Sequence, residues 1–202
     1  NLLHPFQPFI VGQRIIGPAM AKKFGVKLVM YGENQAEYGN SIEENTNPIM
    51  NMDFYSSDNA LEMKFGGLSM QEYIDSGNYT KDDFAPYIAP EKQELIDAGV
   101  EVHYLGYYLK WDPQECYYYA VDNTGFQANP VRSEGTYSKY SSIDDKIDPF
   151  HYFTTLIKFG IGRCTYDAAQ EVRNDKITRD EAAYLVKKYD TEFPSIYFQD
   201  FL

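Results

Sequence analysis

The pattern of apolar and polar positions predicts helices and short strands in alternation along the first half of the chain. Residues 18–24 suit a helix with Pro18 in its first turn and Gly25 as its C-cap. The short apolar run over residues 26–31 is of β type and predicts a strand. Residues 100–109 alternate and are rich in β-branched and aromatic side chains, which predicts a second strand. This order is typical of α/β folds, in which ligands bind at the carboxyl ends of parallel strands.

Helix start signals recur through the rest of the chain. Ser69, Thr80 and Thr178 each precede an acidic residue three positions later, which is the pattern of a capping box. Asp112 and Asp148 are each followed by proline, and this pair is favoured where a helix begins. The second half of the chain is therefore predicted to be mainly helical.

Two segments show neither a helical nor a strand period. Residues 40–59 are polar and rich in asparagine, so we interpret them as a surface excursion. Residues 126–148 are also aperiodic. An irregular stretch of this length in a compact domain more often has a function than serves only as a connection between elements.

Composition and charge narrow the class of protein. The 202 residues are 44% hydrophobic, which is enough to form a core, and no repeat or low-complexity linker divides them, so we expect a single domain over residues 1–202. The 18 basic and 30 acidic residues leave a net charge of −12, which disfavours nucleic acid and membrane surfaces as partners. The chain lacks a long apolar run and a signal-peptide pattern, so we expect a cytoplasmic protein.

The cysteine and histidine residues show no spacing typical of a metal site. Cys116 and Cys164 are far apart, and both are expected to be buried, reduced and inside helices. The histidines His4, His103 and His151 are isolated from one another. His103 falls in the second predicted strand, and we interpret it as a packed imidazole rather than a base.

The first candidate site directly follows the first predicted strand. Glu33 and Glu37 lie four residues apart with Asn34 between them. If this segment turns into a helix, both carboxylates face one ligand and can hold Mg²⁺ or a substrate nitrogen. Alternatively, the two acidic residues only complement a helix dipole, a contribution of ~0.3–1 kcal/mol each. The spacing alone leaves both interpretations open.

The second candidate site lies in the aperiodic stretch 126–148. Its hydroxyl groups, alternating charges and glycine suit hydrogen bonding to a polyhydroxylated or phosphorylated ligand, although a solvated surface loop explains the same composition. The candidate residues are Arg132, Glu134, Gly135, Thr136, Tyr137, Lys139 and Lys146. Further along, Arg163 follows two glycines at the end of an apolar helix. There it either stabilises a helix C-terminus or faces a phosphate.

Several short sequence motifs, taken in their order along the chain, resemble those of the N-acetyl sugar amidotransferase family. These motifs are Phe9 to Gln13, Val29 to Gly39, Leu105 to Tyr108, Glu134 to Tyr140, Asp144 to Lys146 and Phe159 to Arg163. The resemblance covers nearly the whole chain. Members of this family modify sugars of lipopolysaccharide O-antigen and of flagellar pseudaminic and legionaminic acid.

The family is similar to other PP-loop ATP pyrophosphatases, including the synthetase half of asparagine synthetase. The run Gly32-Glu33-Asn34-x-x-Glu37 resembles the Gly-Glu-Gly-x-Asp-Glu segment of that enzyme. The resemblance implies an α/β fold: a parallel sheet of the adenine-nucleotide alpha-hydrolase type, followed here by a mainly α-helical part. It also implies that Glu33, Asn34 and Glu37 lie near the reacting centre, and that the 132–146 loop and Arg163 bind the substrate.

The implied reaction uses ATP and Mg²⁺ to activate an amide or carboxyl oxygen as an adenylate. Ammonia then displaces AMP and leaves an acetamidino or amide group. The resemblance implies two partners for this reaction, a separate glutaminase subunit that supplies the ammonia and a sugar nucleotide or nonulosonic acid as the substrate.

The chain departs from the family pattern in one respect. The Ser-Gly-Gly-x-Asp-Ser loop that binds pyrophosphate and the cysteine-pair segment expected near the N-terminus of the family are absent from these 202 residues, and in family order both lie upstream of Asn1. We therefore expect the chain to be the later part of a longer enzyme, inactive by itself. Two other classes stay open: a non-catalytic interaction module of the same fold, and a ligase similar to asparagine synthetase that acts on a free amino acid.

Overall fold

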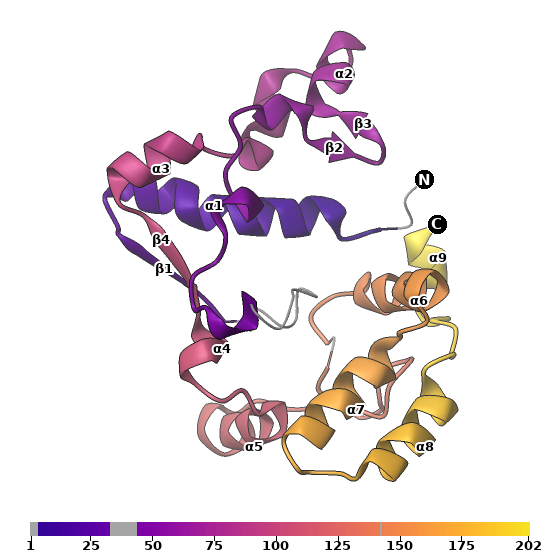
Figure 1. Cartoon of the computed structure of the whole chain (residues 1–202). Coiled ribbons are helices and arrows are strands. Elements are labelled where there is room, and N and C mark those ends of the chain that lie inside the picture. Colours follow the sequence, from indigo (N-terminus) through magenta and orange to yellow (C-terminus); the bar gives the residue numbers. More distant parts are fainter. Residues whose placement is uncertain (1–3, 33–43, 142) are drawn as a thin grey trace. The chain divides into compact units, whose positions relative to one another are not determined.

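The computed structural model describes residues 4–32, 44–141 and 143–202 (Figure 1). Contacts divide these residues into two compact units, one within residues 7–111 and one within residues 112–202 together with 4–6. The first unit contains a small parallel sheet and the second is mostly helical, which confirms the predicted mixed α/β class. That residues 1–202 form a single domain of a longer enzyme stays a prediction.

The first unit is built on helix α1 (Gln7–Phe24) and the parallel strands β1 (Leu28–Tyr31) and β4 (Glu101–Tyr104). Leu28 pairs with Glu101 and Tyr31 with Tyr104, so both strands end at the same edge. The first strand is confirmed. The second ends earlier than predicted: its register with β1 runs to the pair Tyr31 and Tyr104, and the chain then turns into helix α4 (Leu105–Tyr108).

Helix α1 ends where predicted, before Gly25, which has a φ of 71°. Its predicted start was wrong: the helix begins at Gln7, so Pro18 lies inside it rather than in its first turn. Pro18 is fully buried, and packing of this kind can outweigh the hydrogen bond that an internal proline removes. Gly17 permits a close approach to β1, because a Cβ atom there would lie 3.2 Å from the Val29 side chain.

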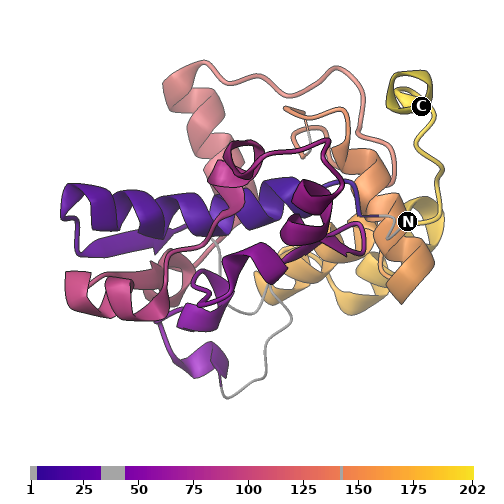
Figure 2. The same cartoon turned by 90° about the horizontal axis from the view of Figure 1, so that it is seen from above.

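The core of the first unit forms between α1, the sheet and helix α3 (Lys92–Ala98). Helix α3 lies beside α1 in both views (Figures 1 and 2), and Lys22 of α1 forms an ion pair with Glu94 of α3 at 2.6 Å. The buried members of this core are Ala21, Tyr31, Met50, Tyr55, Leu95, Val100, Val102 and Tyr104.

Shorter elements complete the first unit. They are the 3-10 helices η2 (Glu44–Thr46), η3 (Met52–Phe54), η4 (Ala60–Glu62) and η5 (Lys81–Tyr87), strands β2 (Lys64–Phe65) and β3 (Leu68–Ser69), and helix α2 (Met70–Asp75). The capping box at Ser69 is confirmed, since its hydroxyl accepts the Glu72 N–H and the Glu72 carboxylate accepts the Ser69 N–H. In the described part of 40–59, η2 and η3 are the regular elements.

The second unit contains the helices α5 (Pro113–Thr124), α6 (Asp148–Phe159), α7 (Arg163–Arg173), α8 (Arg179–Tyr189) and α9 (Phe198–Phe201). The predicted helix starts are confirmed: Asp112 accepts the Glu115 N–H, and Thr178 forms a capping box with Glu181. Helices α7 and α8 pack against each other (Figure 1).

Candidate functional site

The common edge of the parallel strands is the first place to look for a site. Gly32 follows β1 directly and Leu105 follows β4, so two connecting segments leave the sheet at its carboxyl edge. In α/β folds this edge is where ligands bind. Glu33, Asn34 and Glu37 begin just beyond Gly32 in the sequence, but they lie outside the described residues, and their catalytic role stays a prediction.

The second predicted site is the stretch between α5 and α6, whose described residues, 125–141 and 143–147, form no helix or strand, as expected. It is nevertheless packed rather than loosely solvated at its centre, because Thr136 is completely buried and Ser138 is nearly so. The Ser133 N–H donates to the Ser138 carbonyl at 2.9 Å, which closes a tight turn around Gly135. This turn fixes the backbone positions of Glu134, Gly135, Thr136 and Tyr137 relative to one another.

Arg132 and Glu192 join this stretch to the end of the second unit. Two guanidinium nitrogens of Arg132 each lie 2.6 Å from a carboxylate oxygen of Glu192. The Gly135 N–H donates to the same carboxylate at 2.8 Å, and Arg132 lies over the Tyr189 ring, 4.6 Å from its centroid. The hydrogen bond from Arg132 is the main cause that lowers the pKa of Glu192. Arg132 and Gly135 therefore hold the fold together at this point.

Glu134 and Lys146 also contact the C-terminal segment. The Glu134 carboxylate accepts the N–H of Ser195 at 2.8 Å and that of Ile196 at 3.1 Å. Lys146 donates to Asp200 at 2.7 Å, although both side chains are more than half exposed. Glu134 and Lys146 thus contact the segment that follows residue 192, whereas Arg132 contacts Glu192 itself.

Lys139 has a local partner instead. Its ammonium group donates to the Pro130 carbonyl at 3.1 Å, and this contact is exposed. An exposed bond to a neutral carbonyl costs little to replace, so among the predicted cations Lys139 is held least firmly.

Arg163, at the start of α7, is surrounded by acidic and aromatic groups. Its Nε lies 3.2 Å from Asp167, one of its terminal nitrogens lies 3.6 Å from Asp148, and its guanidinium lies 4.4 Å from the centroid of the Tyr152 ring. The Thr136 hydroxyl donates to the second oxygen of Asp167 at 2.5 Å. Arg163 and Thr136 thus connect the irregular stretch to α6 and α7.

Burial dominates the electrostatics of this cluster. It raises the pKa of Asp148 to about 6, against the opposing effect of Arg163, and it also raises the pKa of Asp167. Burial together with the nearby charges of Glu171 and Asp167 raises the pKa of Tyr137 above its ordinary range. Tyr137 is therefore a neutral phenol at any physiological pH.

Two pockets adjoin the irregular stretch. One has a volume of about 330 Å³ and includes Arg132, Glu134 and Lys146 in its lining. The other has about 600 Å³ and is lined in part by Tyr137 and Lys139. The first volume is at the lower end of the range for small-ligand sites. Five of the eight predicted substrate residues thus reach a pocket, whereas Gly135, Thr136 and Arg163 do not line either one.

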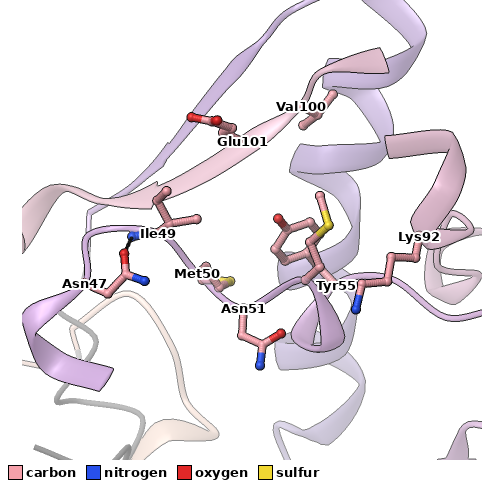
Figure 3. Close-up of a pocket in the computed structure, with 9 residues that line it drawn as sticks. Asn47, Ile49, Met50, Asn51, Tyr55, Lys92, Val100 and Glu101 are labelled. Carbon is pink, nitrogen blue, oxygen red and sulfur yellow. Dashed lines mark hydrogen bonds between the residues drawn. The ribbon is translucent and has the colours of Figure 1, made fainter. Parts of the chain in front are cut away.

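A further pocket, of about 490 Å³, lies along β4 in the first unit (Figure 3). Asn47 and Asn51 line it, and each uses its amide oxygen to accept a nearby backbone N–H, from Ile49 and Asp53 respectively. Figure 3 shows the Glu101 carboxylate pointing away from Tyr55, to the other side of β4.

The sequence did not reveal the acidic partners of these residues. Asp167 and Glu192 lie on or beyond helices α7 and α8, and no local pattern links them to Thr136 or Arg132. Cys164 is buried as expected, but the prediction for Cys116 was wrong, because that thiol is exposed on α5. Helix α5 has no fully buried residue, which explains its exposure.

The described residues show neither a metal cluster nor a membrane-spanning element. Within residues 4–32, 44–141 and 143–202, no three His, Cys, Asp or Glu side chains are grouped so that they could hold a metal ion. None of the described helices combines the length and the apolar stretch needed to cross a bilayer.

Comparison with known families gives one match. Residues 134–202 match the family model described as LPS biosynthesis protein WbpG-like, C-terminal domain. A search of curated proteins gave no significant match. The C-terminal part of the chain is therefore similar to a family of lipopolysaccharide biosynthesis, and the match begins inside the irregular stretch that lines the 330 Å³ pocket.

Proposed function

We propose that this chain is part of an ATP-dependent amidotransferase of surface polysaccharide biosynthesis. The reaction converts the N-acetyl or carboxyl group of a nucleotide-linked or nonulosonic sugar, of the pseudaminic or legionaminic acid type, into an acetamidino or amide group. The observation that carries the proposal is the match of residues 134–202 to a lipopolysaccharide biosynthesis family. The reaction type is inferred from the resemblance of the other sequence motifs, those before residue 134, to sugar amidotransferases.

The parallel sheet supports the location of the chemistry. The segment with Glu33, Asn34 and Glu37 leaves β1 at the carboxyl edge, where α/β folds bind their ligands. A carboxylate there can orient incoming ammonia and stabilise the positive charge that develops on its nitrogen as it attacks. The three residues are proposed as catalytic on this basis.

The 330 Å³ pocket is proposed as the sugar site. Its lining places Arg132 and Lys146 beside Glu134, so it offers both donors and acceptors to the hydroxyl groups of a sugar. The paired hydrogen bonds from Arg132 to Glu192 hold the Arg132 side chain in position before a ligand arrives. Holding it in this way lowers the entropy that is lost on binding.

ATP is proposed as the co-substrate and Mg²⁺ as its counterion. The described residues do not fit Mg²⁺, because no three of their acidic or histidine side chains are grouped to hold it, and we derive no step through the metal. Ammonia is proposed to come from a glutaminase subunit, and we propose a cytoplasmic location because ATP and sugar nucleotides are found there.

The test uses the full native polypeptide in which these residues occur, with ATP, Mg²⁺ and ammonium chloride as a direct nitrogen source. Formation of AMP and pyrophosphate that requires both ammonia and an N-acetyl sugar nucleotide or nonulosonic acid is expected. AMP formation with aspartate but not with sugars would instead establish a ligase similar to asparagine synthetase. Sugar binding in calorimetry without AMP formation would establish a non-catalytic binding module.

A further inference from the structure

Three polar side chains of the first unit form a hydrogen-bonded chain that the proposed function has not yet used. Nε2 of His103 lies 3.2 Å from Oε2 of Glu101, and Nδ1 of His103 lies 2.7 Å from the hydroxyl of Tyr108. The rings of His103 and Tyr108 are stacked, with 6.1 Å between centroids and an interplanar angle of 12°. The imidazole is therefore fixed at both nitrogens, with the phenol ring nearly parallel to it.

The chemistry of the three groups sets the direction of their hydrogen bonds. An ionised carboxylate only accepts, so Nε2 of His103 carries the proton that Glu101 accepts. In a neutral imidazole the other nitrogen is then an acceptor, and the Tyr108 hydroxyl donates to Nδ1. The lone pairs of the Tyr108 oxygen remain available to a group outside the chain.

Tyr108 is a solvent-exposed end of this series of hydrogen-bonded side chains. The Tyr108 side chain is 50% exposed, whereas only 14% of the His103 side chain is. The Glu101 carboxylate at the other end is also exposed, at 63% of its side chain, but it only accepts hydrogen bonds, so an external proton donor reaches the imidazole through the phenol. A base held by a third, acidic group and bonded to an exposed hydroxyl is the arrangement by which enzymes activate hydroxyl groups for proton transfer.

The surroundings offer room for a substrate beside this hydroxyl. In the parallel register Leu28 lies opposite Glu101 and Met30 opposite His103, so these four side chains share one face of the sheet. Helix α1 covers the other face, where Gly17 approaches Val29. Leu28 and Met30 are both exposed. The three-residue chain therefore adjoins an apolar surface that the described residues leave open.

We propose that Glu101, His103 and Tyr108 form a proton relay that serves the ammonia step, an inference that rests on the proposed amidotransfer reaction. In that step the ammonia nitrogen forms a bond to the activated carbon and gives up a proton. The carbon–oxygen bond to AMP then breaks, and its electron pair leaves with AMP. The Tyr108 oxygen takes the proton from nitrogen while its own proton moves to Nδ1 of His103, and the Glu101 carboxylate stabilises the imidazolium. Tyr108 is the catalytic residue, and His103 and Glu101 are positioning residues.

The chain contains a matched control for Tyr108. The neighbouring Tyr107 is also 50% exposed, its ring packs edge-on against that of Tyr108 at 5.3 Å, and its hydroxyl makes no hydrogen bond to the described residues. Tyr107→Phe and Tyr108→Phe remove the same atom from adjacent positions of α4. They differ in whether that atom bonds to His103.

Activity measurements on the full native polypeptide test the relay. Tyr108→Phe and His103→Gln are each expected to lower kcat for sugar-dependent AMP release by ~10²-fold, the usual contribution of one general base, with little change in KM. The double variant is expected to lower kcat no further than either single variant, because both substitutions interrupt the same proton-transfer pathway. Glu101→Gln is expected to have a smaller effect, and Tyr107→Phe none. Equal kcat values for Tyr107→Phe and Tyr108→Phe would overturn the relay.

A spectroscopic measurement separates failure of the relay from failure of the proposed function. Nitrogen NMR of the imidazoles, assigned with His103→Gln, is expected to show His103 protonated at Nε2, and a changed Nδ1 signal in Tyr108→Phe but not in Tyr107→Phe. Protonation at Nδ1, or identical spectra for the two tyrosine variants, would refute the relay even in an active enzyme. The expected spectra in a wild-type protein that forms no AMP would overturn the amidotransfer reaction, and with it the role assigned to the relay.

Discussion

Arg132 and Glu192 form two parallel hydrogen bonds, each 2.6 Å long, across a separation of 60 residues. This pair ties the irregular stretch before α6 to the segment after α8. Planar guanidinium and carboxylate groups match in such a geometry, which makes it stronger than a single contact between point charges. The irregular stretch is thus held in place by side chains rather than by regular backbone structure.

Arg132→Gln tests the energetic weight of this pair. Both side chains are about one third exposed, so solvent weakens the pair and we expect the free energy of unfolding to fall by ~1 kcal/mol. Denaturant titration measures this change. The control is Lys146→Gln, which removes the far more exposed ion pair to Asp200 and should not change the denaturation midpoint measurably. Equal midpoints for the two variants would contradict a structural role for Arg132.

Gly162→Ala tests the contact between the start of α7 and the end of α8. A Cβ atom at this position would lie 2.6 Å from Oδ1 of Asp190 and 2.9 Å from its carbonyl oxygen. Asp190 also accepts the N–H groups of Gly162 and Thr165, so it cannot move without losing them. We expect the substitution to lower the free energy of unfolding by ~1–3 kcal/mol.

The matched control for this substitution is Gly32→Ala. A Cβ atom at Gly32 meets none of the described atoms within 4 Å, and its φ does not require glycine. Thermal melting should therefore separate the two variants. A melting temperature of Gly162→Ala as high as that of Gly32→Ala would show that α7 and α8 do not pack as described.

Asp148 predicts a specific dependence of stability on pH. Its folded pKa of about 6 lies above the ordinary 3.8, mainly because of burial, so the folded state binds this proton more tightly than the unfolded state. The contribution of Asp148 to the free energy of unfolding therefore falls as pH rises from about 4 to about 6. Asp148→Asn removes the titration, and Arg163 keeps Asp167 as its partner.

The expected result is a variant more stable than the wild type at neutral pH, by an amount on the order of 1–3 kcal/mol. The difference should disappear below about pH 3, where the wild-type carboxyl is protonated in both states, and this provides an internal control. Chemical denaturation across this range measures it. A variant less stable than the wild type at neutral pH would mean that attraction to Arg163 outweighs the cost of burying the charge.

Local signals explain which parts of the fold could be predicted from the sequence. Asp112 and Thr178 begin helices because a capping side chain bonds to backbone groups only three residues away. The end of α1 at Gly25 is local in the same sense. The start of α1 was missed, because Pro18 suggested a first turn whereas packing of the buried proline allows the helix to continue through it.

Contacts between distant residues explain what could not be predicted. Nothing near Thr136 in sequence indicates that Asp167 accepts its hydroxyl proton. For His103 a partial signal existed, since alternation in a strand places it on the same face as Glu101. Tyr108 could not be added, because the predicted strand ran on to residue 109, whereas the chain turns into α4 after Tyr104.

The predicted catalytic residues can be tested by substitution in the full native polypeptide. If Glu33 and Glu37 stabilise the transition state at the carboxyl edge, changing either one to Gln should lower kcat by ~10²-fold, equal to ~2.7 kcal/mol, with almost no change in melting temperature. Paired turnover and melting measurements decide between this role and a helix cap. A helix cap predicts the reverse, a lower melting temperature with turnover intact.

Isotopic labelling of the acetamido oxygen tests the proposed amidotransfer most directly. The sugar substrate is prepared with heavy oxygen in its acetamido group and is incubated with the full native polypeptide, ATP, Mg²⁺ and ammonia. Activation of that oxygen by ATP predicts that the label appears in the phosphate of AMP, in an amount equal to the acetamidino sugar formed. In a parallel reaction the label is placed in the carboxyl oxygens of the sugar acid instead. Unlabelled AMP from both labelled substrates would contradict the proposed function.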